Sequence, residues 1–85
     1  MNIVVTGASS GLGCAIAQAL ANESHTVTRY DLEHGRDVLH PERIWPARVD
    51  VLVNCAGVNK INWLANVKES EWDAVMDTNA KGIFL

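Results

Sequence analysis

Three glycines stand where an apolar segment meets an alanine-rich one near the start of the chain. Ile3-Val4-Val5 is typical of a buried strand, and Thr6-Gly7-Ala8-Ser9-Ser10-Gly11-Leu12-Gly13 joins it to a segment with apolar residues at helical spacing. Gly7 would permit a tight turn, and Gly11 and Gly13 would let the backbone approach a ligand closely. Because the free N–H groups at a helix start attract anions, this segment predicts a phosphate-binding turn.

Two related phosphate-binding fingerprints are excluded by counting. Position 16 is Ile16 rather than the third glycine of GxGxxG, and no Gly-Lys-Ser/Thr follows for a P-loop. Hydroxyl contacts from Thr6, Ser9 and Ser10 would suit a phosphate. The spacing alone also allows a tight strand-to-helix turn that binds nothing.

An acidic residue follows the next predicted strand. Thr26 to Tyr30 is β-branched and aromatic, and Asp31 comes 18 positions after Gly13. An acidic residue at about this offset binds the ribose hydroxyls of a dinucleotide, and its charge repels a 2′-phosphate. Asp31 therefore favours NAD over NADP, although Arg29, on the same face of the strand, would soften that preference. A solvated aspartate at a strand end is the alternative.

The remaining elements are expected at four places. Val49 to Val53 is an apolar run broken only by Asp50, which suits a parallel strand covered on both faces. Asp37-Val38-Leu39 permits a very short strand, and Glu42 to Ile44 a short helix that Pro46 would end. A last helix is expected from an N-cap at Ser70. Two helix faces are predicted, the first of Leu12, Ile16, Ala19 and Leu20, the second of Trp72, Val75, Met76, Asn79 and Ile83.

Composition narrows the class of protein. The chain has 85 residues, 48% of them hydrophobic, and a formal net charge of -3 without a basic stripe, so nucleic-acid binding is not expected. No stretch approaches the roughly 20 apolar residues that span a bilayer, and Met1 leads directly into a strand without a secretory signal, so we expect a cytoplasmic protein. Cys14 and Cys55 show no metal-ligand spacing, so we expect reduced thiols and no metal.

These motifs, in this order, resemble the short-chain dehydrogenase/reductase family. Thr6 to Gly13 resembles its TGxxxGxG cofactor loop. Asn54-Cys55-Ala56-Gly57 resembles its NNAG segment after the fourth strand, with Cys55 in place of the second Asn. Glu71-Trp72-Asp73 through Asn79 resembles the helix that follows, with its Asn.

The resemblance implies a fold and a set of site residues. The fold is α/β, a doubly wound Rossmann-type parallel sheet with helices on both faces, truncated after about four strands, with residues 1–85 forming part of a dinucleotide-binding domain. The pyrophosphate would be held by Thr6, Gly7, Ser9, Ser10, Gly11, Leu12 and Gly13, the adenosine ribose by Asp31, and the adenine by Asp37 and Val38. The nicotinamide side would be lined by Asn54, Cys55, Ala56 and Gly57.

Asn79 is the one catalytic residue that the resemblance implies within the chain. It would belong to the family's catalytic tetrad and hold a water in a proton relay; an amide that bridges backbone groups in the core is the alternative. The other tetrad members, a Ser and a Tyr-x-x-x-Lys pair, have no counterpart, because the only tyrosine is Tyr30 and the residue four places later is His34. These residues alone therefore lack the proton donor that carbonyl reduction needs.

Two departures shape the expected function. The interval from Asp31 to Asn54 is short for the family, so a third strand and the helix before the fourth would be reduced, and the chain ends in Gly82-Ile83-Phe84-Leu85 without a helix stop. We expect the N-terminal part of an NAD(P)-dependent oxidoreductase that interconverts a secondary alcohol and a ketone, homo-oligomeric when intact. A non-catalytic or decayed nucleotide-binding module, and an epimerase or regulator on the same fold, are the alternatives.

Overall fold

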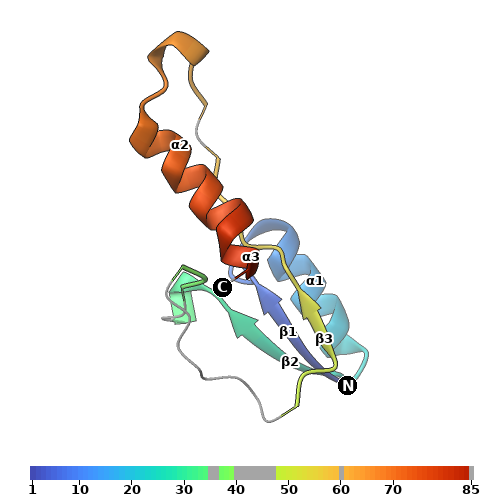
Figure 1. Ribbon diagram of the computed structural model, residues 1–85. Helices are drawn as coiled ribbons and strands as arrows, with labels where there is room; N and C mark the ends of the chain where they lie inside the picture. Colours follow the sequence, from blue (N-terminus) through green and yellow to red (C-terminus); the bar gives the residue numbers. More distant parts are fainter. Residues whose placement is uncertain (35–36, 40–47, 60, 85) are drawn as a thin grey trace.

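The computed structural model describes residues 1–34, 37–39, 48–59 and 61–84. Along the chain run β1 (Asn2–Thr6), α1 (Gly11–Asn22), β2 (Thr26–Tyr30), a 3₁₀ turn (Leu32–His34) and β3 (Val51–Val53). A second 3₁₀ turn (Leu64–Asn66) precedes a helical segment of three parts: α2 (Glu69–Met76), a π-helical turn (Asp77–Lys81) and α3 (Gly82–Phe84). The molecule is elongated, because α2 projects away from the sheet (Figure 1).

The three strands form one parallel sheet with the order β2-β1-β3. Thr6 lies opposite Tyr30 on one side, and Val5 lies opposite Val53 on the other, so the carboxyl ends of the strands meet at one edge. In the doubly wound strand order 3-2-1-4, the neighbour of the first strand on the side away from the second is the fourth. β3 occupies that place, and the Rossmann-type α/β class expected from the sequence is confirmed.

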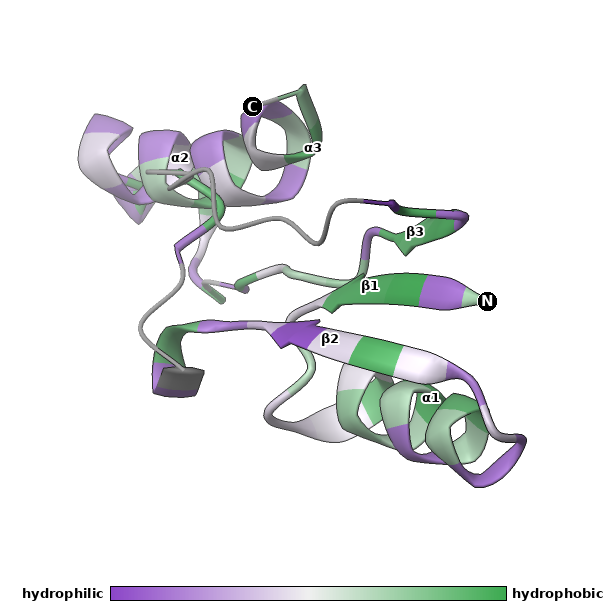
Figure 2. Ribbon diagram, turned by 90° about the horizontal axis from the view of Figure 1, so that it is seen from below, coloured by the Kyte–Doolittle hydropathy of each residue, from purple (hydrophilic) through white to green (hydrophobic). Residues whose placement is uncertain are grey.

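Helix α1 and the sheet bury the core. Ile3 and Val5 of β1 pack with Ala8 and Ala17. Figure 2 shows α1 on this side of the sheet. The buried positions of α1 are Gly13 and Ala17, whereas Leu12 is 70% exposed and Ala19 is also exposed. Of the predicted helix face, Ile16 and Leu20 pack against this core as expected. The prediction was wrong for Leu12 and Ala19, because only glycine fits where α1 touches the preceding turn.

The helical segment at residues 69–84 lies on the side of the sheet opposite α1, mostly beyond the carboxyl ends of the strands (Figures 1 and 2). Its N-cap is Lys68 rather than the predicted Ser70, because the Glu71 carboxylate accepts the backbone N–H of Lys68 at 3.4 Å. The π-helical turn shifts the register of every later residue. Most of the predicted apolar face is not buried, because α2 projects away from the sheet: Trp72, Met76 and Ile83 are 61%, 43% and 57% exposed, whereas Val75 is half-buried.

Two expectations concern the interval between β2 and β3. Asp37-Val38-Leu39 forms an isolated bridge and a turn instead of a strand. The reason is local, since the Asp37 carboxylate accepts the backbone N–H of Leu39 at 2.9 Å and so competes with a strand ladder. The sheet thus has three described strands where about four were predicted, and the short helix expected at 42–44 lies outside the described residues.

Asp50, just before β3, forms hydrogen bonds with Asn2 at the start of β1. Its carboxylate accepts the backbone N–H of Asn2 at 2.8 Å, and its own N–H donates to the Asn2 carbonyl at 2.8 Å. The Arg48 guanidinium binds the other carboxylate oxygen at 2.8 Å. The backbone hydrogen bond, then the Arg48 contact, hold the pKa of Asp50 below its usual value despite a small opposing effect of burial.

We therefore expect Asp50→Asn to lower the melting temperature at pH 7, with a difference from wild type that shrinks in acid. A carboxyl whose pKa is lower in the folded state stabilises the fold above its unfolded pKa, and this contribution is lost as pH falls through the folded pKa. Thermal unfolding between pH 2 and 7 measures it. Asp73→Asn, which removes the same charge from the exposed side of α2, is the control; a pH-independent deficit in Asp50→Asn would contradict the expectation.

Candidate functional site

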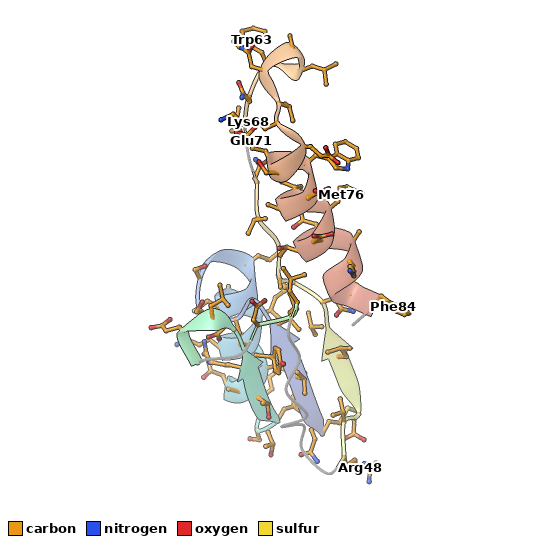
Figure 3. All side chains as sticks on the ribbon, turned by 60° about the vertical axis from the view of Figure 1, so that its left-hand side comes forward. Arg48, Trp63, Lys68, Glu71, Met76 and Phe84 are labelled. Carbon is orange, nitrogen blue, oxygen red and sulfur yellow. The ribbon has the colours of Figure 1, made fainter. Side chains whose placement is uncertain are left out.

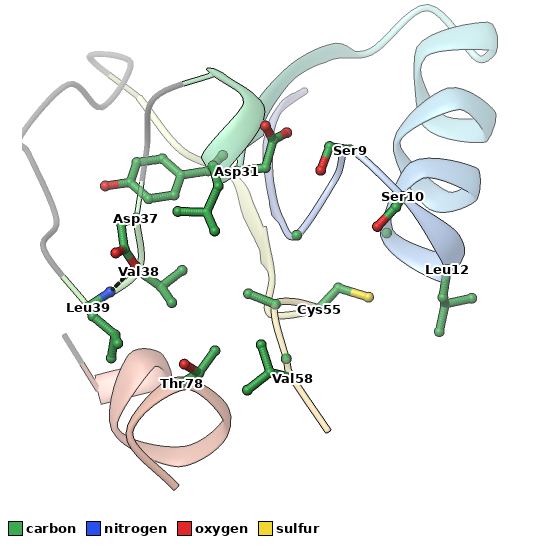
Figure 4. A pocket seen from close by; sticks show the side chains of 16 residues that line it. Ser9, Ser10, Leu12, Asp31, Asp37, Val38, Leu39, Cys55, Val58 and Thr78 are labelled. Atoms are coloured by element: carbon green, nitrogen blue, oxygen red, sulfur yellow. Dashed lines mark hydrogen bonds between the residues drawn. The ribbon is translucent and has the colours of Figure 1, made fainter. Parts of the chain in front are cut away.

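A cleft of about 390 Å³ opens at the carboxyl ends of the strands (Figure 4). Its volume falls in the range of small-molecule sites. In open α/β sheets this edge is where ligands bind. Its lining comes from five separated stretches: Gly7, Ser9, Ser10, Leu12 and Gly13; Tyr30, Asp31 and Leu32; Asp37, Val38 and Leu39; Cys55, Ala56, Gly57 and Val58; and Thr78.

The turn between β1 and α1 depends on its glycines in different ways. Gly7 and Gly11 have φ values of 63° and 57°, in the left-handed region that other residues adopt only at a cost. A Cβ on Gly7 would also lie 2.7 Å from the Cα of Ala56, whereas one on Gly11 would meet nothing. A Cβ on Gly13 would overlap the carbonyl oxygen of Gly7. Gly13 thus lets α1 pack closely against the turn. The sequence had predicted a different reason for this glycine, the close approach of a ligand.

Thr6 joins the two loops that flank the cleft. Its buried hydroxyl accepts the backbone N–H groups of Cys55 and Ala56, each at 3.0 Å, and lies 3.5 Å from the Val53 carbonyl. This arrangement explains why Thr6 does not line the large cleft although the resemblance placed it on the pyrophosphate. Its hydroxyl is already engaged in holding the loop after β3 against the end of β1.

Asp31 lies at the end of β2, lines the cleft and is only 5% exposed. The Gly7 N–H donates to the Tyr30 carbonyl at 2.9 Å, so Asp31 is held beside the glycine turn. Arg29 does not line the cleft. Its guanidinium donates to the Ala8 carbonyl at 2.9 Å and lies 3.7 Å from the Cys14 sulfur, which places it against the turn and the first turn of α1.

The far wall of the cleft includes residues that were not among the predicted cofactor residues. Val38 packs against α3, where a Cβ on Gly82 would lie 2.9 Å from a Val38 methyl group. Thr78, Leu39 and Val58 were missed as lining residues (Figure 4). Leu39 and Val58 directly follow predicted residues, Val38 and Gly57, whereas Thr78 comes from a helical segment that no local pattern connects to the cleft.

Asn79 binds the backbone of Val58 with both ends of its side chain. The Val58 N–H donates to Oδ1 at 2.8 Å, and Nδ2 donates to the Val58 carbonyl at 2.9 Å. The residue is exposed, which corrects the prediction that it lies on a buried apolar face. Its place in the π-helical turn explains the difference, because the extra residue in that turn rotates Asn79 toward the loop after β3.

Replacing this amide should loosen the loop after β3. Asn79→Ala removes two partly solvated hydrogen bonds, for which we expect a loss of about 1 kcal/mol in stability. Amide hydrogen exchange at Val58 should become faster than in wild type. The control is Asn59→Ala, an exposed amide in the same loop, and equal exchange rates in the two variants would show that the Asn79 contact does not hold the loop.

Most of the predicted cofactor residues meet in this cleft. Those that line it are Gly7, Ser9, Ser10, Leu12, Gly13, Asp31, Asp37, Val38, Cys55, Ala56 and Gly57. Four lie outside its lining: Thr6 and Asn54 border a much smaller cavity beside Gly82, Gly11 is exposed at the start of α1, and Asn79 binds Val58. The site is therefore assembled mainly by backbone turns and small residues.

Across residues 1–34, 37–39, 48–59 and 61–84, no three His, Cys, Asp or Glu side chains lie close enough together to hold a metal ion. None of the helices in this part of the chain is long and apolar enough to cross a membrane. Cys14 and Cys55 are free thiols and half-buried.

The parallel sheet, the glycine turn and the cleft at its carboxyl edge define a Rossmann-type α/β protein. The chain belongs to the short-chain dehydrogenase family, whose model, described as short chain dehydrogenase, matches residues 38–85. The expected family is thereby confirmed, and with it membership of a group of oxidoreductases.

Three relatives illustrate the likeness. The chain is 34% identical to the 3-oxoacyl-[acyl-carrier-protein] reductase FabG of Staphylococcus epidermidis, over 95% of this chain and 46% of that protein. It is 32% identical to the short-chain reductase protein NovJ of Streptomyces niveus, over 93% of this chain and 41% of the relative. It is 36% identical to the glycine betaine reductase ATRR of Emericella nidulans, over 94% of this chain and 9% of that protein.

The chain spans less than half the length of these relatives. The match to FabG extends over 111 positions but includes only about 81 residues of this chain, which is 95% of its 85 residues. Within the matched stretch, about 30 positions of the relative therefore have no counterpart here. The brevity of the interval between β2 and β3 agrees with such a shortfall.

Proposed function

We propose that this chain binds NAD in the cleft at the carboxyl edge of its sheet, as the cofactor-binding part of an oxidoreductase that interconverts a secondary alcohol and a ketone. The observation that carries the proposal is that the glycine turn, Asp31 and the loop at Cys55–Gly57 line one cleft although they are far apart in sequence. NADP is disfavoured, because the carboxylate of Asp31 would face its 2′-phosphate.

Different residues of the cleft would bind different parts of the dinucleotide. The N-terminus of α1, a helix of 12 residues, would receive the pyrophosphate, helped by the hydroxyls of Ser9 and Ser10. Asp31 would accept hydrogen bonds from the adenosine ribose, with Asp37 and Val38 beside the adenine. The bare backbone at Ala56 and Gly57 would let the nicotinamide lie flat against the loop, where the bound cofactor supplies or accepts the hydride.

In this proposal Asn79 acts first on the loop and then on the reaction. Because both polar atoms of its side chain hold Val58, it positions the loop that would carry the nicotinamide ring. The second N–H of Nδ2 and the second lone pair of Oδ1 would remain to hold a water of the proton relay. The proton donor itself is not supplied by these 85 residues, since the only tyrosine, Tyr30, is buried at the end of β2.

The test is a fluorescence titration of NADH with the 85-residue chain, whose length is checked by intact mass. Saturable enhancement of NADH emission that adenosine competes away would support the proposal. No saturation with NADH or NADPH would overturn it. Turnover is measured in the same samples with a secondary alcohol and NAD.

A second candidate function is nucleotide binding without catalysis. It is favoured by the absence from the sequence of a Tyr-x-x-x-Lys pair, which leaves hydride transfer without its acid. Binding of NADH without any turnover would support this function for the chain by itself. A protein that carries the pair and turns over alcohols would instead support the oxidoreductase.

The proposal includes a homo-oligomeric assembly of the intact protein through the segment at residues 69–84. Trp72, Met76 and Phe84 expose apolar surface along one projecting arm (Figure 3). Light scattering after size-exclusion chromatography measures the assembly, and a monomer at all concentrations would contradict it.

A further inference from the structure

We infer that Arg29 is a positioning residue for the anion-binding turn, an inference that rests on the dinucleotide binding proposed above. The residue lies next to the last residue of β2, opposite Val5, on the face that α1 covers. It is half-buried, and its guanidinium reaches across to the turn between β1 and α1. It thus contacts the turn from behind, while the cleft lies on the other side.

The contact fixes the direction of one peptide group. Arg29 Nη1 donates to the Ala8 carbonyl oxygen at 2.9 Å, and Ala8 is completely buried. Because a peptide unit is planar and trans, its carbonyl and the N–H of the next residue point in opposite directions. A carbonyl turned back toward Arg29 therefore directs the N–H of Ser9 toward the cleft, which Ser9 lines.

Neighbouring contacts hold the guanidinium of Arg29 beside the Ala8 carbonyl. The same Nη1 atom lies 3.7 Å from the sulfur of Cys14, in the first turn of α1, so the group bridges the turn and the helix. On the other side of the turn, Gly7 donates to the Tyr30 carbonyl at 2.9 Å. β2 thus holds the turn through a backbone contact at Gly7 and a side-chain contact at Ala8.

The charge of Arg29 adds to this geometric effect. A cation on the carbonyl polarises the Ala8–Ser9 peptide, and a hydrogen bond with a charged donor is about twice as strong as a neutral one. The positive charge also lies behind the N-terminus of α1, whose dipole already favours an anion. Arg29 therefore strengthens the turn as a binding site for a pyrophosphate without touching it.

The test compares Arg29→Met with wild type in calorimetric titrations of NADH, inorganic pyrophosphate and adenosine. We expect Arg29→Met to bind NADH and pyrophosphate about tenfold more weakly, and adenosine within about twofold of wild type, because adenosine carries no phosphate. The amide resonance of Ser9 should also shift in the free protein. Arg48→Met, which removes an exposed arginine at the other end of the sheet, is the matched control and should leave all three affinities unchanged.

Three results would overturn the inference: unchanged NADH and pyrophosphate binding in Arg29→Met, an equal loss for adenosine, or an equal loss in Arg48→Met. If circular dichroism shows that Arg29→Met is unfolded, the same titrations are made with Arg29→Lys. It keeps the charge without the planar fork, so we expect a loss of about threefold for pyrophosphate and none for adenosine. Wild type that binds pyrophosphate but not NADH refutes the proposed function alone, whereas wild type that binds neither refutes both.

Discussion

Gly13→Ala is expected to destabilise the protein by about 3 kcal/mol, the upper part of the range for overpacked sites. A methyl group at this position would overlap the carbonyl oxygen of Gly7, which is backbone and cannot rotate away. Helix α1 would have to move off the turn, and the turn would lose its place beside the loop at Ala56. The gain of up to about 1 kcal/mol in helix propensity does not offset this cost. Urea unfolding followed by circular dichroism measures the change.

Gly11→Ala is the matched control, because the same substitution two residues away meets open space. Its cost arises only from the backbone, since φ at Gly11 is 57°, and we expect about 1 kcal/mol. Gly11→Asn should cost less, as asparagine tolerates this conformation. Equal losses for Gly13→Ala and Gly11→Ala would mean that the close contact between α1 and Gly7 does not limit stability.

The first half of the fold could be predicted from local patterns. Apolar β-branched runs marked β1 and β2, and the glycines between β1 and α1 marked the turn, because each signal comes from residues adjacent in sequence. Ile16 and Leu20 of the predicted helix face pack against the core, whereas Leu12 is exposed. Leucine at position 12 is the larger apolar residue, yet Gly13 is buried, since space against Gly7 rather than hydropathy decides which side of α1 faces inward.

In the second half, local patterns predicted β3 and a helix starting near Ser70, whereas the details of the site depended on contacts that no local pattern contains. The π-helical turn at Asp77–Lys81 carries no clear mark in the sequence, and it alone moves Asn79 from the expected buried face to the Val58 backbone. Likewise, residues 37–39 form a turn instead of the expected strand, because the Asp37 carboxylate accepts the Leu39 N–H. Thr78 and Val58 line the cleft only because the helical segment at 69–84 returns to the end of the sheet.

Asp31→Asn should remove most of the preference for NADH over NADPH. In wild type we expect a preference of about 100-fold, because a carboxylate that is 5% exposed repels a 2′-phosphate in surroundings that screen charge weakly. Asparagine keeps the shape and loses the charge. NADH should bind about tenfold more weakly, since the ribose hydroxyls lose a charged acceptor, and NADPH about tenfold more tightly. Titrations of both cofactors at fixed salt measure the ratio.

Asp37→Asn separates this local effect from a general change in the charge of the cleft. Asp37 lines the same cleft, and its carboxylate oxygen accepts the Leu39 N–H, a hydrogen bond that asparagine can also accept. If the preference arises from contact with the ribose, Asp37→Asn should leave the ratio within about twofold of wild type, because only a charge close to the 2′-position discriminates the two cofactors. If both variants shift the ratio equally, the field of the whole cleft sets the preference, and Asp31 has no special place at the ribose.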